Sequence, residues 1–497
     1  MTPLITPADM RDMEKRFFRE TGTESIELME TAAEALCRAI LARYGSGRTI
    51  YFACGPGGNG GDGYACARML RARGIRAFIA PAGEPTSPDA IENLRRARAA
   101  GVADAPAERP DVWVDALYGT GLSRAPSGES EALIRRMNAD RAQGSAVAAV
   151  DIPSGLSGMT GAAFDPCVGA DVTFTFQYAK PGCFLADGLD AAGEVQVLDI
   201  GIPAEYYPAE SPALVDEAML HRILPPRKRN MHKGTAGHLL IVAGSVGMAG
   251  AAALCALSAL RSGAGLVTVA CPGSILPVLQ TLAPCAMAVP LPEWEGAISD
   301  EAVQALEAIL PGKRAVVCGC GLSQRTSEKV VAAVLDCGLP ALLDADALNL
   351  ISKSDALKAR LRPHHLLTPH PGEAARLLGR ALTDPIQDAL ALRELGAQAL
   401  LKGTASVVAI GRRAVISRSG ASGMAKGGSG DCLSGLIGGL LAQAGAGLTG
   451  EALAEQAAAG SEIHGLAGEI ACAEHSSRGM TALDLIKAIP EALKPYD

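Results

Sequence analysis

The feature that most constrains the fold is an apolar run that passes through a glycine-rich segment into a helical pattern. Thr49–Cys54 reads TIYFAC and is followed by GPGGNGGDG and then by the amphipathic YACARMLRARG. Gly55, Gly57 and Gly60 satisfy the spacing GxGxxG between a strand and a helix, the context in which this motif binds a nucleotide. The segment predicts a parallel α/β fold and a dinucleotide-like ligand. An ordinary NAD-dependent dehydrogenase is disfavoured, because Glu84 is the only candidate for a ribose-binding acid after the next strand.

Strand-like and helical segments alternate in both halves of the chain. Strand-like runs occur at VWVDALYG (112–119) and SAVAAVDIP (145–153), and a second series begins with HLLIVAG (238–244). Such alternation is typical of parallel sheets. Between the two series the composition changes to PAEYYPAESPA and then to PPRKRN. We therefore expect two α/β domains, residues 1–211 and 217–497.

Composition excludes several classes of partner. The net charge of −8 and the lack of a long basic run argue against a nucleic-acid surface. The 13 cysteines lie scattered in apolar segments without a CxxC pair, which favours reduced buried thiols. The N-terminus lacks an apolar signal region, and no run of eighteen apolar residues occurs. We expect a cytoplasmic protein that binds small molecules rather than nucleic acid or membrane, and that forms a homo-oligomer.

Three further loops combine glycines with carboxylates. Asp115 lies shortly before GTGLSR, Asp151 opens DIPSGLSG, and Asp431 lies within MAKGGSGDCLSG, after which an apolar pattern at helical spacing predicts a helix beginning at Asp431. Each aspartate could be a turn or helix-terminal residue. A helix N-terminus behind a glycine loop attracts anions, so Asp431 could instead take a proton from a hydroxyl that attacks a phosphoryl group. No Walker A sequence accompanies it, and His464 is interpreted as a packed helix residue.

Together these motifs resemble one enzyme family. GPGGNGGDG, VDALYGTGLSR and VDIPSGLSG in the first half, with HKGTAGHLLIVAGS, LLDADALN, LTPHPGE and GGSGDCLSG in the second, are similar to the bifunctional NAD(P)H-hydrate repair enzymes over nearly the whole chain. The resemblance implies an N-terminal Rossmann-like three-layer epimerase domain and a C-terminal ribokinase-like α/β dehydratase domain. It implies interconversion of the R and S hydrates NADHX and NADPHX at C6, and dehydration of the S form with ADP, or with ATP in its place.

For the second half, the resemblance implies that Asp431 deprotonates the C6 hydroxyl and that Gly321 and His370 contact the hydrate. His370 has a rival role as a structural histidine before Pro371. Mg²⁺ would accompany the phosphates, although the sequence identifies no ligands for it. The nucleotide-binding residues would be Lys402, Gly403, Thr404, Ala405, Ser406, Gly428, Ser429 and Gly430.

For the first half, the resemblance makes Asp151 a hydrate contact and our candidate acid or base for epimerisation. Asn59, Asp115 and Ser154 would form a K⁺ site, and hard oxygen ligands suit such a cation. Gly58 stands where the family usually has a second asparagine, which puts one side-chain contact to the hydrate in question. The hydrate-binding loops would be Gly58, Asn59, Gly60, Gly61, Asp62, Gly119, Thr120, Gly121, Leu122, Ser123, Arg124 and Ala125.

Two other functions are compatible with parts of this pattern. A ribokinase-like kinase of the hydroxymethylpyrimidine or thiazole type, fused to a nucleotide-binding domain, would also contain GGSGD. A nucleotide-sensing scaffold would use the first half as an interaction module. LTPHPGE and the epimerase-like half count against the kinase, and the shortage of basic residues counts against an RNA-associated scaffold.

Overall fold

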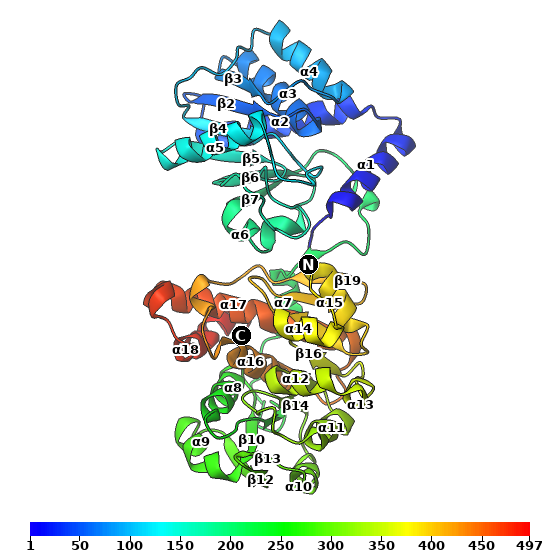
Figure 1. The fold of residues 1–497 in the computed structure, drawn as a ribbon, viewed down its shortest axis with the longest axis vertical. Coiled ribbons are helices and arrows are strands. Elements are labelled where there is room, and N and C mark those ends of the chain that lie inside the picture. Colours follow the sequence, from blue (N-terminus) through cyan, green and yellow to red (C-terminus); the bar gives the residue numbers. More distant parts are fainter. The chain divides into compact units, whose positions relative to one another are not determined.

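The structure, a computed structural model, describes all 497 residues and divides into two compact units (Figure 1). One unit comprises Pro3–Pro212, and the other comprises Met1–Thr2 and Ala213–Asp497. Each unit has its own predominantly parallel sheet with helices packed against it, which confirms the predicted α/β class. None of the helices combines the length and apolar composition needed to cross a membrane.

The N-terminal unit contains a six-stranded parallel sheet in the order β3-β2-β4-β5-β6-β7. The chain leaves β2 for β3 on one side and continues with β4 on the other side of β2. Loops that follow β2 and β4 therefore diverge, and such a switch point leaves a crevice at the carboxyl ends of the strands. The elements are β2 (Thr49–Cys54), β3 (Arg76–Pro81), β4 (Val112–Ala116), β5 (Ala146–Val150), β6 (Val172–Phe176), β7 (Glu194–Leu198), α1 (Pro7–Thr21), α2 (Ser25–Tyr44), α3 (Gly58–Ala72), α4 (Pro88–Ala99), α5 (Glu129–Ala142) and α6 (Gly188–Ala191).

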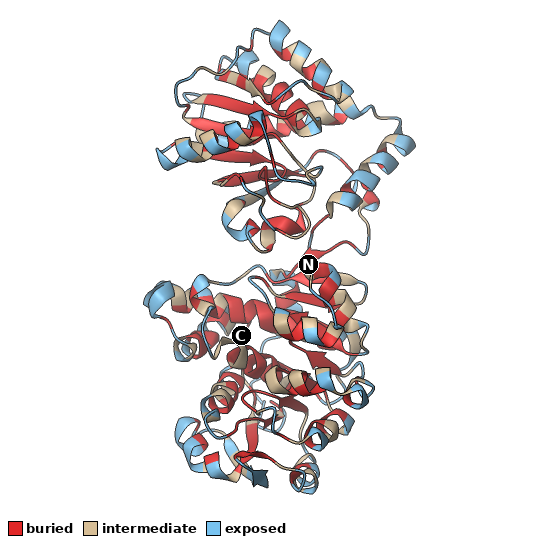
Figure 2. Cartoon of the chain, in the orientation of Figure 1, coloured by how far each residue is buried: buried red, intermediate tan, exposed pale blue.

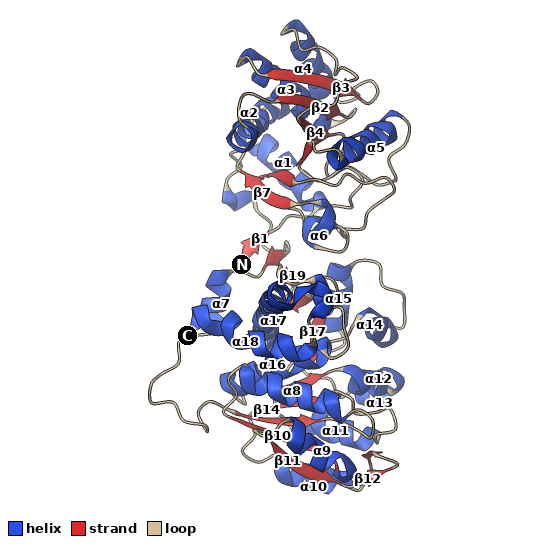
Figure 3. Ribbon diagram, turned by 90° about the vertical axis from the view of Figure 1, so that its left-hand side faces the viewer, coloured by secondary structure: helices blue, strands red, loops and turns tan.

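Both faces of this sheet are buried. Phe52 and Val114 belong to a core that includes residues of α1, α2 and α3, whereas Tyr51 and Trp113 belong to a second core with Ile134 of α5. Figure 3 shows α2 and α5 on opposite sides of the strands. In Figure 2 the central strands β2, β4, β5 and β6 are accordingly red along most of their length, whereas the edge strands β3 and β7 are partly exposed. Burial on both faces explains why these strands are apolar without polar alternation.

The C-terminal sheet has the order β1-β8-β19-β18-β17-β16-β15-β14-β9-β10-β11. Strands from β17 to β11 in this order are parallel, and β18 runs antiparallel to both of its neighbours. The strands are β1 (Thr2–Pro3), β8 (Ala213–Leu214), β9 (His238–Val242), β10 (Leu266–Pro272), β11 (Met287–Leu291), β14 (Ala315–Cys318), β15 (Ala341–Leu343), β16 (His365–Leu367), β17 (Gln398–Leu401), β18 (Val407–Ile410) and β19 (Arg413–Ile416), with a separate hairpin β12 (Glu293–Trp294) and β13 (Ala297–Ile298).

Twelve helices accompany the C-terminal sheet. They are α7 (Glu217–Ile223), α8 (Ala249–Arg261), α9 (Leu276–Leu282), α10 (Ala302–Ile309), α11 (Glu328–Asp336), α12 (Ala345–Lys353), α13 (Asp355–Lys358), α14 (Pro371–Leu378), α15 (Pro385–Arg393), α16 (Ser429–Ala444), α17 (Gly450–Gly479) and α18 (Ala482–Leu493).

Helix α16 lies in the core of this unit because its small residues allow close contact on two sides. A Cβ atom added to Gly435 would lie 2.1 Å from the Cys255 carbonyl oxygen of α8, and one added to Gly438 would lie 2.3 Å from a Val317 methyl of β14. The helix begins at Ser429, so the predicted start at Asp431 is two residues late. Gly428, with φ at 94°, is the N-cap, and Asp431 lies in the first helical turn.

The glycine-rich segment after β2 is only partly a loop, because α3 already begins at Gly58. Its glycines are required by packing. A Cβ atom on Gly60 would lie 1.9 Å from the Gly55 carbonyl oxygen, and one on Gly61 would lie 2.7 Å from the Met29 sulfur. The turn and the first turn of α3 are therefore pressed against each other and against α2.

We predict that Gly60→Ala lowers the free energy of unfolding of the N-terminal unit by about 1–3 kcal/mol, the usual cost of overpacking. The matched control is Gly58→Ala in the same helical turn, where an added Cβ atom would meet nothing within 4 Å. This control should not destabilise, since alanine is the better helix former. Urea unfolding followed by circular dichroism measures both variants, and equal stability of the two would contradict the packing argument.

Candidate functional site

The candidate residues of the C-terminal unit gather at the carboxyl ends of four neighbouring parallel strands. Gly321 follows β14, Asp344 follows β15, His370 follows β16 and Lys402 follows β17. The first turn of α16 lies at the same edge, since a Cβ atom on Gly430 would lie 3.6 Å from the Lys402 ammonium nitrogen. The predicted hydrate-binding and nucleotide-binding segments therefore converge where open α/β sheets bind their ligands.

A buried ion pair lies beneath this edge. The Lys402 ammonium donates to the Asp344 Oδ1 atom at 2.6 Å, and the Ser434 hydroxyl of α16 donates to Oδ2 at 2.6 Å. The Asp344 side chain is 2% exposed. Burial disfavours the charged form of Lys402, but the charge and hydrogen bond of Asp344 outweigh it, so the pKa of Lys402 is raised. The ammonium is thereby held in place beside α16. Sequence reasoning did not single out Asp344 or Ser434.

Asp431 is the carboxylate nearest the anion-attracting end of α16. No side chain caps this helix, and the Ser429 N–H donates to the Lys426 carbonyl oxygen at 3.4 Å, so the next amide N–H group, that of Gly430, is available to a ligand. Burial raises the pKa of Asp431 to about 6, and the negative charge of Asp344 adds to the effect, while Lys402 opposes it. Asp431 therefore becomes a stronger base than a surface aspartate but remains largely ionised at neutral pH.

His370 is the N-cap of α14 and is neutral. Its Nδ1 atom accepts from the Gly372 N–H at 3.0 Å, while the backbone N–H of His370 donates to the Glu373 Oε2 atom at 2.9 Å. Burial lowers its pKa, and the nearby Lys402 lowers it further. With Nδ1 acting as an acceptor, the proton is on Nε2, and the side chain is 53% exposed. The structural role of His370 as a helix cap is confirmed, and its contact with the hydrate stays a prediction.

Two buried residues of α17 contact the start of α16 and the segment that follows β19. His464 lies against α16, with Nε2 3.1 Å from the Ser429 carbonyl oxygen, and burial lowers its pKa to about 4. It is a packed helix residue, as predicted. Glu462 accepts from the Ser417 and Ser419 hydroxyls at 2.9 and 2.6 Å. An isolated glutamate within an apolar helix offers no motif, so the sequence did not reveal this support.

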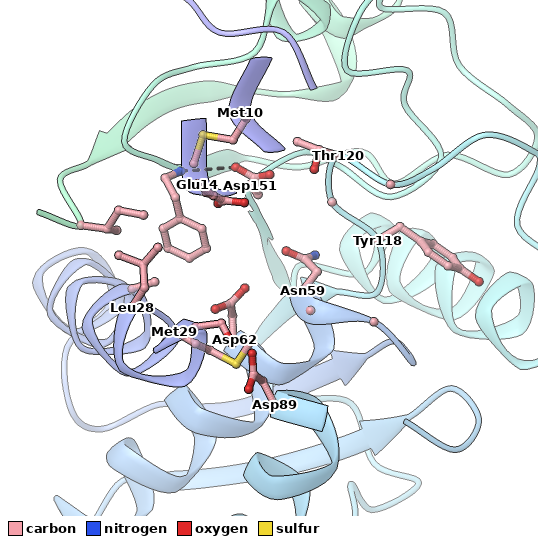
Figure 4. A pocket seen from close by; sticks show the side chains of 18 of the residues that line it. Met10, Glu14, Leu28, Met29, Asn59, Asp62, Asp89, Tyr118, Thr120 and Asp151 are labelled. Carbon is pink, nitrogen blue, oxygen red and sulfur yellow. Dashed lines mark hydrogen bonds between the residues drawn. The ribbon is translucent and has the colours of Figure 1, made fainter. Parts of the chain in front are cut away.

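The N-terminal unit contains a cavity of about 520 Å³ at its switch point. Figure 4 shows Asn59, Tyr118, Thr120 and Asp151 around it. Other predicted residues that line it are Gly58, Asp62, Gly119, Gly121 and Leu122. Gly60 and Gly61 are buried in packing, and the lining does not include Ser123, Arg124 or Ala125.

Asp151 is held by a fully buried lysine. The Lys180 ammonium donates to the Asp151 Oδ1 atom, which also accepts from the Thr175 hydroxyl at 3.2 Å and from the Phe176 N–H at 3.3 Å. The other carboxylate oxygen, Oδ2, faces Gly119, where an added Cβ atom would lie 3.3 Å from it. One oxygen is thus occupied by the protein, and the other is directed at the cavity. Lys180 carries no sequence motif and was not predicted.

The predicted cation ligands lie partly together. Asp115 is fully buried without a basic partner, and burial raises its pKa to about 6. The Ser154 hydroxyl donates to Asp115 Oδ1 at 2.7 Å and lies 3.3 Å from the Tyr118 carbonyl oxygen. The Oδ1 atom of Asn59 lies beside Gly119, where an added Cβ atom would be 3.3 Å from it. No group of three or more His, Cys, Asp or Glu side chains is arranged to hold a metal ion, but a buried carboxylate with neighbouring oxygens suits a monovalent cation.

Comparison with known proteins covers both units. A family described as NAD(P)H-hydrate dehydratase matches residues 239–491, and one described as YjeF-related protein N-terminus matches residues 25–182. The bifunctional NAD(P)H-hydrate repair enzyme Nnr of Moorella thermoacetica is 35% identical over 99% of this chain and 96% of its own length. That of Escherichia coli (strain K12) is 36% identical over 98% of this chain and 93% of its own length.

The chain belongs to the bifunctional NAD(P)H-hydrate repair enzyme family. The resemblance inferred from the motifs is confirmed over the full length. Among solved structures, the ADP/ATP-dependent NAD(P)H-hydrate dehydratase from Bacillus subtilis, co-crystallised with ATP/Mg²⁺, is 29% identical. It covers 58% of this chain and all of its own, with a TM-score of 0.48.

We predict that Lys402→Met lowers the free energy of unfolding of the C-terminal unit by about 3–5 kcal/mol. The substitution removes the ammonium partner of Asp344 and leaves a buried charge unpaired. Lys329→Met is the matched control, since Lys329 pairs with Asp300 at the same distance of 2.6 Å but on the surface. Its effect should be much smaller. Denaturant unfolding without nucleotide measures both, and similar losses would contradict the assigned role of burial.

Proposed function

We propose that this chain repairs hydrated NADH and NADPH by two activities. Residues 1–211 epimerise the R and S hydrates at C6, and residues 217–497 dehydrate the S hydrate with ADP, releasing AMP and phosphate. The observation that carries the proposal is that one chain of this family holds two separate carboxylate sites, Asp151 at the cavity of the N-terminal unit and Asp431 at an uncapped helix N-terminus beside the Lys402 ammonium.

For dehydration, the Asp431 carboxylate takes the proton of the C6 hydroxyl, whose oxygen then attacks the terminal phosphorus of ADP while the bond to AMP breaks. The N–H group of Gly430, with the Lys402 ammonium, stabilises charge on the phosphoryl oxygens, and Ser429 adjoins them at the start of α16. The C6–O bond then breaks with phosphate as the leaving group, and loss of the C5 proton restores the double bond. Phosphate leaves far more readily than hydroxide, which explains why a kinase-like site can perform a dehydration.

His370 and Gly321 flank the hydrate in this arrangement. The neutral His370 offers its Nε2–H group as a hydrogen-bond donor, because Nδ1 already accepts from Gly372. Gly321 adopts φ at 61°, and an added Cβ atom would lie 2.9 Å from Met248 and Ala251, so no side chain fits there. Lys402–Ser406 would contact the nucleotide, and Mg²⁺ would enter with its phosphates.

For epimerisation, Asp151 is the acid or base that faces the bound hydrate through its Oδ2 atom. K⁺ would be held by Asp115 and Ser154, with Asn59 on the ligand side of Gly119, and would supply positive charge to the loops after β4 and β5. Asp115 fits this role because its buried carboxyl group has no basic neighbour. Thr120 and Leu122 line the cavity on the same side.

The product of the reaction distinguishes this proposal from a small-molecule kinase. Mixed R and S hydrates, given to the protein with ADP or with ATP, should return all NADPH absorbance at 340 nm. An enzyme-free control corrects for slow spontaneous epimerisation. Consumption of S alone would show that the epimerase is inactive and would point to Gly58. A stable phosphorylated hydrate with no NADPH formed would establish the kinase alternative instead.

Asp431→Asn should lower the dehydration rate of S hydrate by about a hundredfold to ten-thousandfold, because the general base is lost. Since the pKa of Asp431 is about 6, the wild-type rate should fall about tenfold per pH unit as the pH drops below that value. Stopped assays of NADPH formation measure both. Epimerisation, followed by chromatography of R and S, is the internal control. Undiminished dehydration by Asp431→Asn would refute the assigned base.

A further inference from the structure

A second acidic side chain faces the epimerase cavity, and no motif marks it. Glu14 of α1 is half-buried and lines the same cavity as Asp151. Figure 4 shows the Glu14 and Asp151 carboxyl groups along the upper wall, with Asp62 and Asp89 along the lower wall. The groups that act on Glu14 come from several elements, namely Asp151, Lys180 and Arg11 directly, and Asp62 across the cavity.

These carboxyl groups have different surroundings. Asp151 accepts from the Lys180 ammonium on one oxygen, so it is the member that is paired with a positive charge. Glu14 has no such partner: burial raises its pKa to about 7, Asp151 adds to the effect, and Lys180 and Arg11 oppose it. Burial raises the pKa of Asp62 well above its usual value, and Asp151, Glu14 and Asp89 add to the effect, while Lys180 opposes it. A carboxyl group that is paired with an ammonium, beside one that is not, suits a division into base and acid.

Epimerisation at C6 needs one proton acceptor and one proton donor. In a ring-opening route, a base removes the hydroxyl proton, the C6–O bond becomes a carbonyl, and the C6–N1 electron pair goes to N1, which takes a proton from an acid. Rotation about C5–C6 and reversal of these transfers closes the ring with the opposite configuration. In an iminium route, an acid protonates the hydroxyl, which leaves as water, and water returns to the other face and gives a proton to a base. Both routes conserve protons and electrons.

We infer that Glu14 is the proton-donating partner of Asp151 in the epimerase site, an inference that rests on the proposed epimerase function. Asp151 removes a proton through Oδ2, and Glu14, on the same cavity wall, donates one to N1 or to the departing hydroxyl. Glu14 suits this better than Asp62, because a group that titrates near the working pH both gives and regains its proton. Asp62 lies on the opposite wall of the cavity, further from Asp151.

The test is Glu14→Gln, which keeps the size and polarity of the side chain but cannot transfer a proton. Epimerisation of purified R hydrate should slow by about a hundredfold to ten-thousandfold, while dehydration of S hydrate with ADP, performed by the other unit, stays at the wild-type rate. Because protonated Glu14 is required, wild-type epimerisation should fall as the pH rises through about 7, and this basic limb should be absent from the residual activity of the variant. Chromatographic separation of R and S measures both rates.

Asp12→Asn is the matched control, because Asp12 lies on the same helix and is exposed, paired only with Lys15 at 3.6 Å. It should leave rate and pH profile unchanged. A merely structural role for Glu14 would lower the rate without removing the basic limb, and that result overturns the inference, as does a Glu14→Gln rate within twofold of wild type. Should the variant fail to fold, a wild-type profile flat from pH 6 to 8 overturns it equally. No epimerisation by the wild-type protein would instead refute the proposed function itself.

Discussion

Each unit depends on one buried ammonium that holds a carboxylate at the carboxyl ends of parallel strands. Lys180 occupies one oxygen of Asp151 and leaves the other for the cavity, and Lys402 is fixed by Asp344 beside the first turn of α16. A buried ion pair contributes little net stability, since desolvation offsets much of the attraction. Its value here is geometric and electrostatic, because it fixes which oxygen faces the ligand and supplies positive charge without a mobile surface side chain. The pair in the C-terminal unit also acts on Asp431, whose pKa reflects burial first and the charges of Asp344 and Lys402 next.

These charges are positioned only because the backbone approaches itself very closely at a few glycines. Gly60 contacts the Gly55 carbonyl where β2 passes into α3, and Gly435 contacts the Cys255 carbonyl where α16 crosses α8. A side chain at either position would move a helix away from its sheet or from its neighbour and would shift the first turn that faces the ligand. The two segments are therefore rich in glycine for two reasons. Some glycines let the backbone approach a ligand, and others, including Gly60, let a helix pack closely against another part of the backbone.

These two causes explain how much the sequence could predict. The order of strand, glycine segment and helix was predicted correctly at β2 and α3. Asp431 and Asp151 were singled out because they lie within motifs whose local spacing carries the information. Lys180, Asp344 and Glu14 were not identified, since each is a single charged residue whose importance arises from burial and from partners distant in the chain. The start of α3 at Gly58 was missed for a related reason, because glycine is a poor helix former and only tertiary packing makes it helical there.

Burial has opposite consequences for the two activities. It raises the pKa of Asp431 to about 6 and that of Glu14 to about 7, but in the proposed roles Asp431 acts when ionised and Glu14 acts when protonated. We therefore expect dehydration to be lost as the pH falls below about 6, and epimerisation to be lost as it rises above about 7. Because dehydration consumes only the S hydrate, R hydrate accumulates above this interval, whereas both epimers persist below it. We expect complete repair only in the pH range in which Asp431 is ionised and Glu14 is protonated. Both units then work in the same pH range, although their sites have no residue in common.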